Sequence, residues 1–495
     1  MKWAGAASAC VALLCCASRV FAQLPRDGQP ITTNQYGIDL FQGPVLAGTR
    51  VIGLAGAFVA IGEGVEGNTQ NPAAPAVRVP WSNSHVDFDL GFGLTFPSTL
   101  KNLDFFNSGR RTDLPKGTTD GFVFLDVAAN LQFGKWGLGA TAGLQTYGLN
   151  RDTTTQTSNA ADQLVARISV THVQLARSFA DAQLIIGMGA RIATLAVANE
   201  NNLSSTQQDL FSTVGSGYEA GFVLKPNENQ FRIGGALRTG VTTRPSNNAP
   251  SILYADDPVN RLYLPERVTV PWDLDLGLAI QLGPRPLNPR WVDPSVELQR
   301  VKRFLHWRQL ERERRRRFEL SRTSSLHGDV PAAARALDDE FATESALDDV
   351  TLERAERNLD AEIRRRLREL QRFHVLLLSS LVISGTTQDA VGVESFLERT
   401  TQRSGATLSY SPRFAVETET VPNWLRLRAG SYHEPTRFPS NRQGGRTHGT
   451  LGLDVKLFPF SVFGLVHEGT IWRVSGSLDA ARNYFGWGVA IGVWH

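Results

Sequence analysis

The chain has 495 residues, of which 51 are Lys or Arg and 48 are Asp or Glu. This near balance of charge excludes the strongly basic composition of a typical nucleic-acid binder. All three cysteines, Cys10, Cys15 and Cys16, lie near the start of the chain, so the remainder can form neither disulfides nor thiolate metal sites. We therefore expect no nucleic-acid partner, no metal and no cofactor.

Residues 1–22 have the pattern of a secretory signal peptide. Lys2 supplies a positive charge, and the apolar stretch 4–17 is too short to span a bilayer as a helix. Val20-Phe21-Ala22 indicates cleavage after Ala22, and the polar residues 23–28 end the apolar pattern at once, which argues against a buried helix. The sequence thus predicts an exported chain that lacks cysteine after cleavage.

Most of the remaining chain alternates strictly between apolar and polar or small residues, as strands with one apolar face do. In 271–283, one face holds Trp272, Leu274, Leu276, Leu278, Ile280 and Leu282, and the other holds Asp273, Asp275, Gly277, Ala279 and Gln281. The longest apolar run, 375–383, is far shorter than the roughly 20 residues of a transmembrane helix. A membrane role therefore requires a closed barrel, because only helices and closed barrels satisfy the backbone in lipid.

About fourteen segments follow this pattern, and they predict an all-β transmembrane barrel of antiparallel strands. The expected strands are 84–96, 120–133, 135–148, 164–180, 182–195, 213–225, 229–243, 267–282, 374–384, 404–418, 423–433, 448–458, 462–474 and 482–494. Several connections are only a few residues long, whereas others, such as 97–119 and 244–266, are long and polar. Bacterial outer-membrane barrels have short periplasmic turns and long extracellular loops, so strand parity places the short turns in the periplasm.

By the same parity, a charged insertion at 283–373 belongs to the periplasmic side. It begins with the prolines Pro284, Pro286, Pro289 and Pro294 and continues with apolar residues at helical spacing. These predict an early helix that contains Leu298, Val301, Leu305 and Phe318, a shorter one over 331–347, and a later one from Leu352 to Leu370. The basic run 314–317 is nearly balanced by acidic residues. The insertion is either a hairpin packed on itself, or a docking arm or cap that involves 297–370.

Residues 48–78 read GTRVIGLAGAFVAIGEGVEGNTQNPAAPAVR. Gly53 and Gly56 allow close backbone approach, and Asn71-Pro72 is typical of a tight turn. These features predict a compact hatch or plug-like segment over 23–83, with a glycine-rich first strand as the alternative. The expected organisation is thus a signal peptide (1–22), this segment, barrel strands one to eight (84–282), the helical insertion (283–373) and strands nine to fourteen (374–495).

The segment resembles the N-terminal signature of the FadL-type long-chain fatty-acid transporter superfamily of outer-membrane barrels, including its PorV-like branch. The matching positions are Gly53, Gly56, Ala57, Phe58, Val59, Ala60, Asn71, Pro72 and Ala73. The resemblance implies a fourteen-stranded barrel with an internal hatch, in the cell outer membrane. The short stretch before the motif and the large insertion depart from this pattern.

Two sets of residues are candidates for function. The ligand and hatch candidates are Gly53, Gly56, Phe58, Asn71, Pro72, Phe122 and Phe124, the last two as the lining of a small apolar pocket. The expected lumen charges are Asp126, Arg191, Arg232, Arg238, Asp273, Asp275, Arg413, Glu417, Arg426, Arg428, Asp454 and Lys456. These charges form either a salt-bridge network that holds the barrel rigid, or a polar path or gate.

The sequence contains no nucleophile elbow, phosphate-binding glycine loop or metalloprotease helix, and we expect no enzyme. The first hypothesis is a channel for hydrophobic small molecules such as long-chain fatty acids, with outer-membrane lipid and a hydrophobic ligand as partners. The alternative is a non-transporting scaffold, as in the PorV-like branch, that anchors a periplasmic or secreted protein through 297–370. A general diffusion porin is the third hypothesis, which a plug and crossing salt bridges disfavour.

Overall fold

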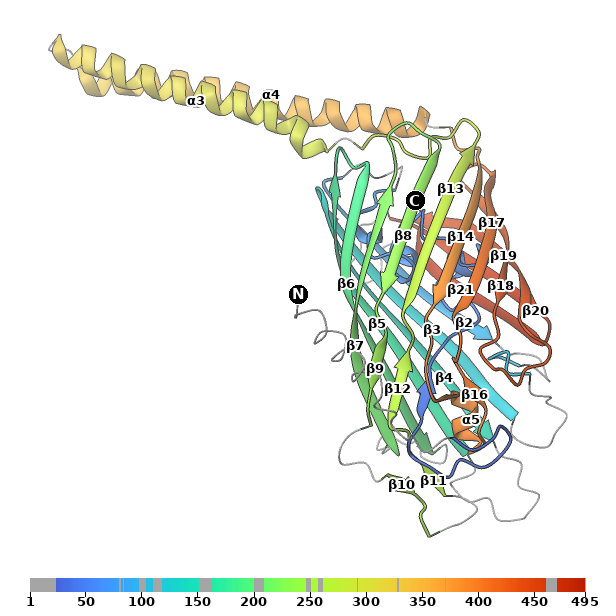
Figure 1. The fold of residues 1–495 in the computed structure, drawn as a ribbon. Coiled ribbons are helices and arrows are strands. Elements are labelled where there is room, and N and C mark those ends of the chain that lie inside the picture. Colours follow the sequence, from blue (N-terminus) through green and yellow to red (C-terminus); the bar gives the residue numbers. More distant parts are fainter. Residues whose placement is uncertain are drawn as a thin grey trace, which may run out of the picture.

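The computed structural model describes residues 24–494 except 80–81, 83, 98–103, 110–117, 151–162, 200–208, 246–250, 257–260, 292, 327–328, 370 and 460–469. Fourteen strands form one closed antiparallel barrel (Figure 1). The barrel closes where its first strand, β2, pairs with its last strand, β21. The predicted fold class is therefore confirmed, while the predicted signal peptide at 1–22 lies outside the described residues.

The barrel strands follow the chain with three interruptions. Their bounds are β2 (Val86–Pro97), β3 (Thr118–Phe133), β4 (Trp136–Asn150), β5 (Gln163–Phe179), β6 (Leu184–Asn199), β7 (Phe211–Leu224), β8 (Phe231–Arg238), β13 (Asp273–Leu282), β14 (Val375–Ser384), β17 (Ser409–Val421), β18 (Leu425–Glu434), β19 (Arg446–Pro459), β20 (Ile471–Ala481) and β21 (Tyr484–Val493). The interruptions lie between β8 and β13, between β13 and β14, and between β14 and β17. The predicted strand 462–474 is displaced, because β20 begins only at Ile471.

The two faces of the wall differ as the alternation predicts. In β13 the exposed residues are Leu276, Leu278, Ile280 and Leu282, and the buried ones are Asp275, Ala279 and Gln281. Exposed apolar side chains suit a lipid-facing exterior, and buried polar ones suit a filled lumen. Among the described helices, none combines the length and the apolar composition needed to cross a membrane.

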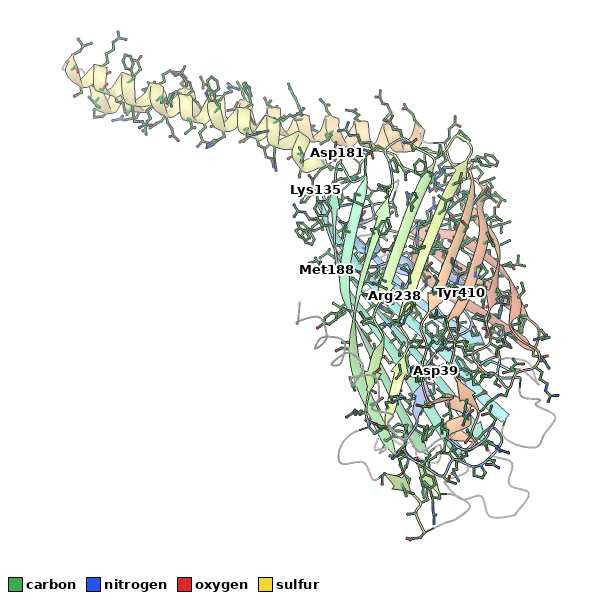
Figure 2. The ribbon with its side chains drawn as sticks, viewed as in Figure 1. Asp39, Lys135, Asp181, Met188, Arg238 and Tyr410 are labelled. Carbon is green, nitrogen blue, oxygen red and sulfur yellow. The ribbon has the colours of Figure 1, made fainter. Side chains whose placement is uncertain are left out.

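The two ends of the barrel are built differently. At one end, here the turn end, tight turns join β3 to β4 and β5 to β6, and the helices between β13 and β14 leave the barrel. Figure 2 shows Lys135 and Asp181 in these turns and Met188 on the outer wall. The opposite end, here the loop end, carries longer connections such as those between β8 and β13 and between β14 and β17.

A second sheet fills the loop end of the lumen. It orders β16 (Arg403–Ser404), β15 (Ala390–Gly392), β1 (Gly37–Asp39), β12 (Arg267–Val270) and β9 (Val241–Thr243), with β1 parallel to both of its neighbours. The helix α5 (Val393–Leu397) accompanies it, and β10 (Ile252–Leu253) pairs with β11 (Leu262–Tyr263) nearby. Apolar side chains of the sheet and of α5, such as Ile38 and Phe396, pack with the wall residues Phe122, Leu164 and Phe211.

This sheet corrects the expectation that 229–243 and 267–282 are single strands. The first divides into β8 and β9, and the second into β12 and β13. Pro271 lies between β12 and β13, and it has no backbone N–H to donate to a ladder, so the regular wall begins only after it. The break lets β12 leave the wall and pair with β1 in the lumen.

The N-terminal part of the chain runs through the lumen. After β1 it continues as an irregular stretch, 40–46, which we call the strap. The helix α2 (Thr49–Gly53), a series of turns and the 3₁₀ helices η1 (Val65–Thr69) and η2 (Ala74–Ala76) then fill the turn end of the lumen. We call residues 49–77 the plug, and nearly all of them are buried.

The insertion is a hairpin of two long helices, α3 (Pro294–Ser325) and α4 (Val330–Glu369). The separate helices predicted over 331–347 and from Leu352 are one continuous helix, because nothing between them breaks the pattern. Figure 1 shows that the hairpin leaves the turn end and runs sideways past the barrel wall, while the last turns of α4 cross the end of the barrel.

Candidate functional site

The plug is shaped by residues that adopt left-handed backbone conformations. Gly56, Gly62 and Gly64 have φ values of 74°, 50° and 68°, which residues with a Cβ adopt at a cost. Asn71 is fully buried and holds the turn before η2, since its side chain accepts from the Ala73 N–H at 3.0 Å. The same side chain donates to Val59 O at 2.8 Å and Phe222 O at 2.9 Å, so it joins the two halves of the plug to β7.

Glycines in the wall make room for the plug backbone. A Cβ on Gly137 or Gly187 would overlap with the carbonyl group of Pro75 or Pro72, respectively. A Cβ on Gly452 would lie 3.0 Å from the Cα of Gly53, where α2 rests on β19. The plug therefore contacts the wall main chain directly at several strands.

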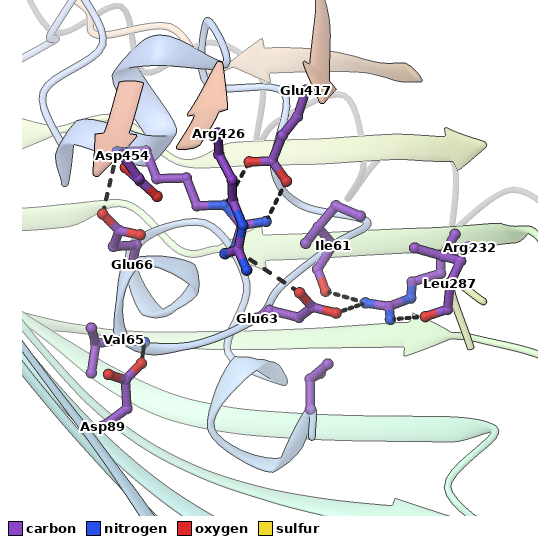
Figure 3. A network of polar contacts seen from close by, with 12 residues as sticks. Ile61, Glu63, Val65, Glu66, Asp89, Arg232, Leu287, Glu417, Arg426 and Asp454 are labelled. Carbon is purple, nitrogen blue, oxygen red and sulfur yellow. Dashed lines mark hydrogen bonds and ion pairs between the residues drawn. The ribbon is translucent and has the colours of Figure 1, made fainter. Parts of the chain in front are cut away.

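Ion pairs link the plug to the wall at the turn end (Figure 3). Arg50 of the plug donates to both carboxylate oxygens of Glu417 on β17, at 3.0 and 2.9 Å. Glu63 accepts from Arg232 of β8 at 2.6 Å, and Glu66 accepts from Arg473 of β20 at 2.8 Å. Such bidentate and charge-assisted contacts are strong and directional, so they fix the position of the plug.

The same network continues along the wall and into the insertion. Arg428 of β18 donates to Asp454 of β19 at 2.7 Å and also contacts Glu417. Arg232 is fully buried and donates to Ile61 O at 3.2 Å in the plug and to Leu287 O at 2.7 Å in the linker before α3. The plug, the wall and the base of the insertion are thus one connected polar unit.

Lys225 lies beside this unit, in the turn after β7, and is buried. Burial lowers the pKa of its ammonium to about 7, nearby Arg232 lowers the pKa further, and Glu63 opposes these effects. Near neutral pH, the side chain therefore exchanges a proton much more readily than an ordinary lysine does.

A cavity of about 210 Å³ lies in the middle of the lumen, between the plug and the loop-end sheet. Its apolar lining comes from the strap and from Phe124, Ile168, Val170 and Val270. Its charged lining consists of Asp126, Arg191, Arg238, Asp273, Asp275 and Arg413, together with His172. The site is therefore amphipathic, with apolar and ionic walls around one partly open space.

Several charged groups of the cavity are not fully paired. Arg238 forms an ion pair with Asp273, and Arg191 contacts the same carboxylate at 3.1 Å. Arg413 donates to Gly56 O at 3.2 Å, and within the described residues no carboxylate lies within ion-pair distance of it. Burial without a partner is costly for such groups, so they favour a polar guest, whether water or a ligand group.

Unsatisfied polar atoms mark the same space. Among the described residues, Asp126 Oδ1, Asp275 Oδ1 and the Nε atoms of Arg191, Arg238 and Arg413 are buried without a hydrogen-bond partner. All five residues line the cavity. Convergent unpaired donors and acceptors next to an apolar surface are what a small polar-headed ligand requires.

The structure divides the predicted site residues between these regions. Gly53, Gly56, Phe58, Asn71 and Pro72 lie in the plug, where Phe58 stacks under the Arg50 guanidinium at 4.9 Å. Phe124 lines the cavity, but Phe122 does not, because it packs on Phe105 in the loop-end core at a ring distance of 4.3 Å.

The predicted lumen charges form two groups. Asp126, Arg191, Arg238, Asp273, Asp275 and Arg413 surround the cavity, and Arg232, Glu417, Arg426, Arg428 and Asp454 belong to the turn-end network. Lys456 joins neither group, because it lies near the end of β19 with its ammonium 6.0 Å from the Trp424 ring.

Sequence reasoning missed the plug charges. Arg50, Glu63 and Glu66 carry the plug side of the network, and Arg473 carries part of the wall side. The sequence did contain a signal for these residues, namely three charged residues inside an otherwise apolar, glycine-rich segment. Charges that are buried with such a segment need partners of opposite charge, which predicts ion pairs with the wall. Within the described part of the chain, no three His, Asp or Glu side chains converge as a metal site would require.

No family model and no curated protein matches this sequence. Solved structures with a similar fold include a Pseudomonas aeruginosa FadL homologue, at 10% identity with a TM-score of 0.47 over 92% of this chain and 99% of that one. The P. putida toluene transporter TodX follows at 11% identity and a TM-score of 0.44, covering 92% and 98%. The monoaromatic hydrocarbon channel CymD has 8% identity and a TM-score of 0.43, covering 92% and 97%.

Proposed function

We propose that this chain is a gated channel of the outer membrane that takes up small amphipathic molecules through the central cavity. The apolar exterior supports a position in lipid, and the short turns support an orientation with the turn end in the periplasm and the loop end outside. The supporting observation is the cavity, which has apolar and unpaired charged walls and lies between the plug and the loop-end sheet, two elements that are not part of the wall.

The size of the cavity limits the ligand. Drug-sized ligands occupy about 300 to 1,000 Å³, and an apolar cavity of about 150 Å³ holds benzene. A cavity of about 210 Å³ therefore suits a compact molecule of the size of a single ring rather than an extended long-chain fatty acid. Arg413 forms no close ion pair with a described residue, although Asp275 acts on it electrostatically, and its buried Nε is without a hydrogen-bond partner, so an acid or another polar head group suits the charged wall.

Transport requires both closures to move. On the outer side a ligand meets the loop-end sheet, and on the periplasmic side it meets the plug. Because the plug is held by ion pairs and backbone packing rather than by covalent bonds, it is able to shift without unfolding the barrel. We infer that occupation of the cavity shifts the plug, since Arg238 of the cavity donates to Thr69 O of the plug at 2.9 Å.

Uptake into liposomes tests this proposal. Val170 lines the cavity, whereas Val173, three residues later on β5, is exposed on the outer wall. We expect the chain to admit radiolabelled benzoate, Val170→Trp to abolish this uptake by filling the cavity, and Val173→Trp to leave it unchanged. Equal uptake by the two variants, or none above empty liposomes, would refute a transport role for the cavity.

A second candidate function is the scaffold, which the helical hairpin favours because transport through the barrel does not require an arm of this length. In that case the hairpin anchors a periplasmic or secreted protein through 297–370. Deleting these residues discriminates between the two functions: uptake persists if the barrel acts as a channel, and a partner protein is lost from purified membranes if it acts as a scaffold.

A further inference from the structure

The helical hairpin is firmly attached to the rim of the turn end. Asp293 caps α3 and also contacts the His85 ring, which precedes β2, at 3.0 Å. The guanidinium of Arg78 lies 4.5 Å from the Trp291 ring, just before the helix. These contacts fix where α3 starts and tie it to the barrel, so its course past the wall in Figure 1 has a defined origin.

Ion pairs between the helices fix which face of α3 meets α4. Arg312 contacts Asp348 at 2.7 Å, Arg308 contacts the same carboxylate at 2.5 Å, and Arg315 contacts Glu344 at 2.8 Å. Positions 298, 301, 305, 308, 312 and 315 repeat at alternating intervals of three and four residues, which is the spacing of a helix–helix seam. The rotation of α3 about its axis is therefore set by this seam.

A second face of α3, centred about 130° around the helix from the seam, carries an exposed apolar stripe. It consists of Val296, Phe304, Trp307, Leu310 and Phe318, which are between 41% and 64% exposed. At about 100° per residue these five positions fall within roughly a third of the helix circumference. Large apolar side chains aligned in this way on a water-exposed helix indicate a surface that contacts something else.

The charges of the hairpin are segregated between its helices. In α3 there are ten Lys or Arg and four Glu, whereas α4 has seven Arg and eleven Asp or Glu. Arg303 and Arg314 are exposed and fall on the same arc as the apolar stripe. The outward face of α3 is thus both aromatic and basic, and α4 carries the excess of acid.

The position of the hairpin indicates what the stripe face of α3 contacts. At the turn end the exposed apolar wall reaches the strand ends, where Trp136, Phe179, Phe231 and Leu282 are exposed. An aromatic girdle of this kind marks the edge of the lipid. With 32 residues, α3 is about 48 Å long, so a helix that starts at this rim and runs sideways lies alongside the lipid surface.

We propose that the stripe face of α3 binds the anionic phospholipid surface of the membrane next to the turn end. Trp307, Phe304 and Phe318 insert at the level of the head groups, and Arg303 and Arg314 contact lipid phosphates. Basic residues with interleaved aromatic side chains are the usual means by which a helix lies on an anionic membrane. Long arginine side chains reach the phosphates while their stems cover apolar surface.

Site-directed spin labelling of the full barrel tests this directly. The only cysteines lie within 10–16, so refolding the chain from residue 23 gives a cysteine-free background. One label replaces Trp307, and the matched control replaces Ala346, which is exposed on α4 at a position turned away from α3. In bilayers of phosphatidylethanolamine with about one third phosphatidylglycerol, we expect the label at 307 to collide with oxygen and the label at 346 with a water-soluble nickel chelate.

Charge reversal provides the second measurement. Each arginine that leaves an anionic surface weakens binding by about fivefold, so R303E/R314E should reduce lipid contact of the label at 307 by roughly 25-fold or more. The control R354E/R357E makes the same change in net charge on exposed positions of α4 and should have little effect. Heat-dependent gel mobility verifies that every variant still forms the barrel.

Two outcomes overturn the proposal. If the label at 307 meets the nickel chelate as often as the label at 346 in the anionic bilayer, α3 does not lie on lipid. If it becomes protected only after a periplasmic protein extract is added, the stripe is a protein-docking surface instead. Neither outcome bears on uptake through the cavity, which is measured separately.

Discussion

Replacing Gly137 and Gly187 together by alanine should loosen the plug without opening the barrel wall. A Cβ at Gly187 would lie 2.6 Å from Ala73 N, and one at Gly137 would lie 2.5 Å from Ala76 N, whereas ordinary contacts measure 3.4–4 Å. The plug backbone around η2 must therefore move by about 1 Å or more, because main-chain atoms have no alternative rotamer. Both glycines face the lumen, so the outer surface of the barrel is unchanged.

The size of the effect follows from the packing. Inserting a methyl group into a well-packed site costs about 1 to 3 kcal/mol, and because both glycines press on the backbone around η2, the cost of the double variant lies between that of one site and the sum of two, about 1 to 6 kcal/mol. A single substitution then raises the displaced fraction of the plug by roughly 5- to 150-fold, since about 1.4 kcal/mol corresponds to a factor of ten. The double variant brings a rare displaced state into the measurable range.

Hydrogen exchange read by mass spectrometry measures this fraction. Under conditions where opening and closing are fast, the exchange rate of plug amides rises by the same factor as the displaced population. We expect faster exchange over 65–77, with unchanged exchange in β3 to β7. The control is Gly449→Ala, whose Cβ would have no neighbour within 4 Å. Plug exchange identical to that of the control would refute the view that these glycines seat the plug.

Three further predictions concern single side chains. Arg413→Leu should weaken benzoate binding by about 10- to 100-fold and leave toluene binding within about threefold, as titration calorimetry would show; equal losses would mean that the guanidinium does not meet the acid. Lys225→Met should raise the free energy of unfolding below pH 7, where the native state must bury a charge. The stability that Lys225→Met gains over the unmodified chain should vanish as the pH rises from about 7 toward 10.5. Above both pKa values the lysine is neutral in the native and in the unfolded state. A pH-independent difference in urea midpoints would contradict this. Asp348→Asn, which leaves Arg312 without its buried partner, should speed amide exchange in α3 by about 5- to 100-fold, whereas Asp349→Asn, on the exposed side, should not.

The barrel was predictable because its signal is repeated. The barrel strands are eight to seventeen residues long and most of them alternate, so an error in one segment leaves the count intact. The exception, β20, shows the limit: the weak pattern at 462–474 misplaced a strand that begins at Ile471. The loop-end sheet was not predictable, because β15 and β16 have three and two residues and hold their places only through packing against distant parts of the chain.

The candidate site was predictable in its parts but not in its grouping. Alternation alone identified Arg238 and Asp273 as lumen residues, and the structure pairs them. Arg428 belongs to the turn-end network and Arg191 to the cavity. This grouping depends on the position of each residue along the barrel axis, which alternation does not specify. Lys456 also follows the alternation of lumen-facing residues, yet it lies at the rim of the barrel. The end of a strand extends past the plug, so a lumen-facing position there has no plug residue to contact.

The passage of the N-terminal stretch through the lumen constrains how the barrel is assembled. Leu24 contacts Arg403 at the loop end, while the chain leaves the plug at the turn end to begin β2. A finished ring could receive this stretch only by threading more than fifty residues along its axis. We therefore expect the open sheet to form around the N-terminal stretch, which is synthesised first. The β2–β21 pairing, which closes the barrel, should then form last. Under the proposed orientation, an epitope inserted near residue 24 would then reach the outer side only in molecules whose ring had closed.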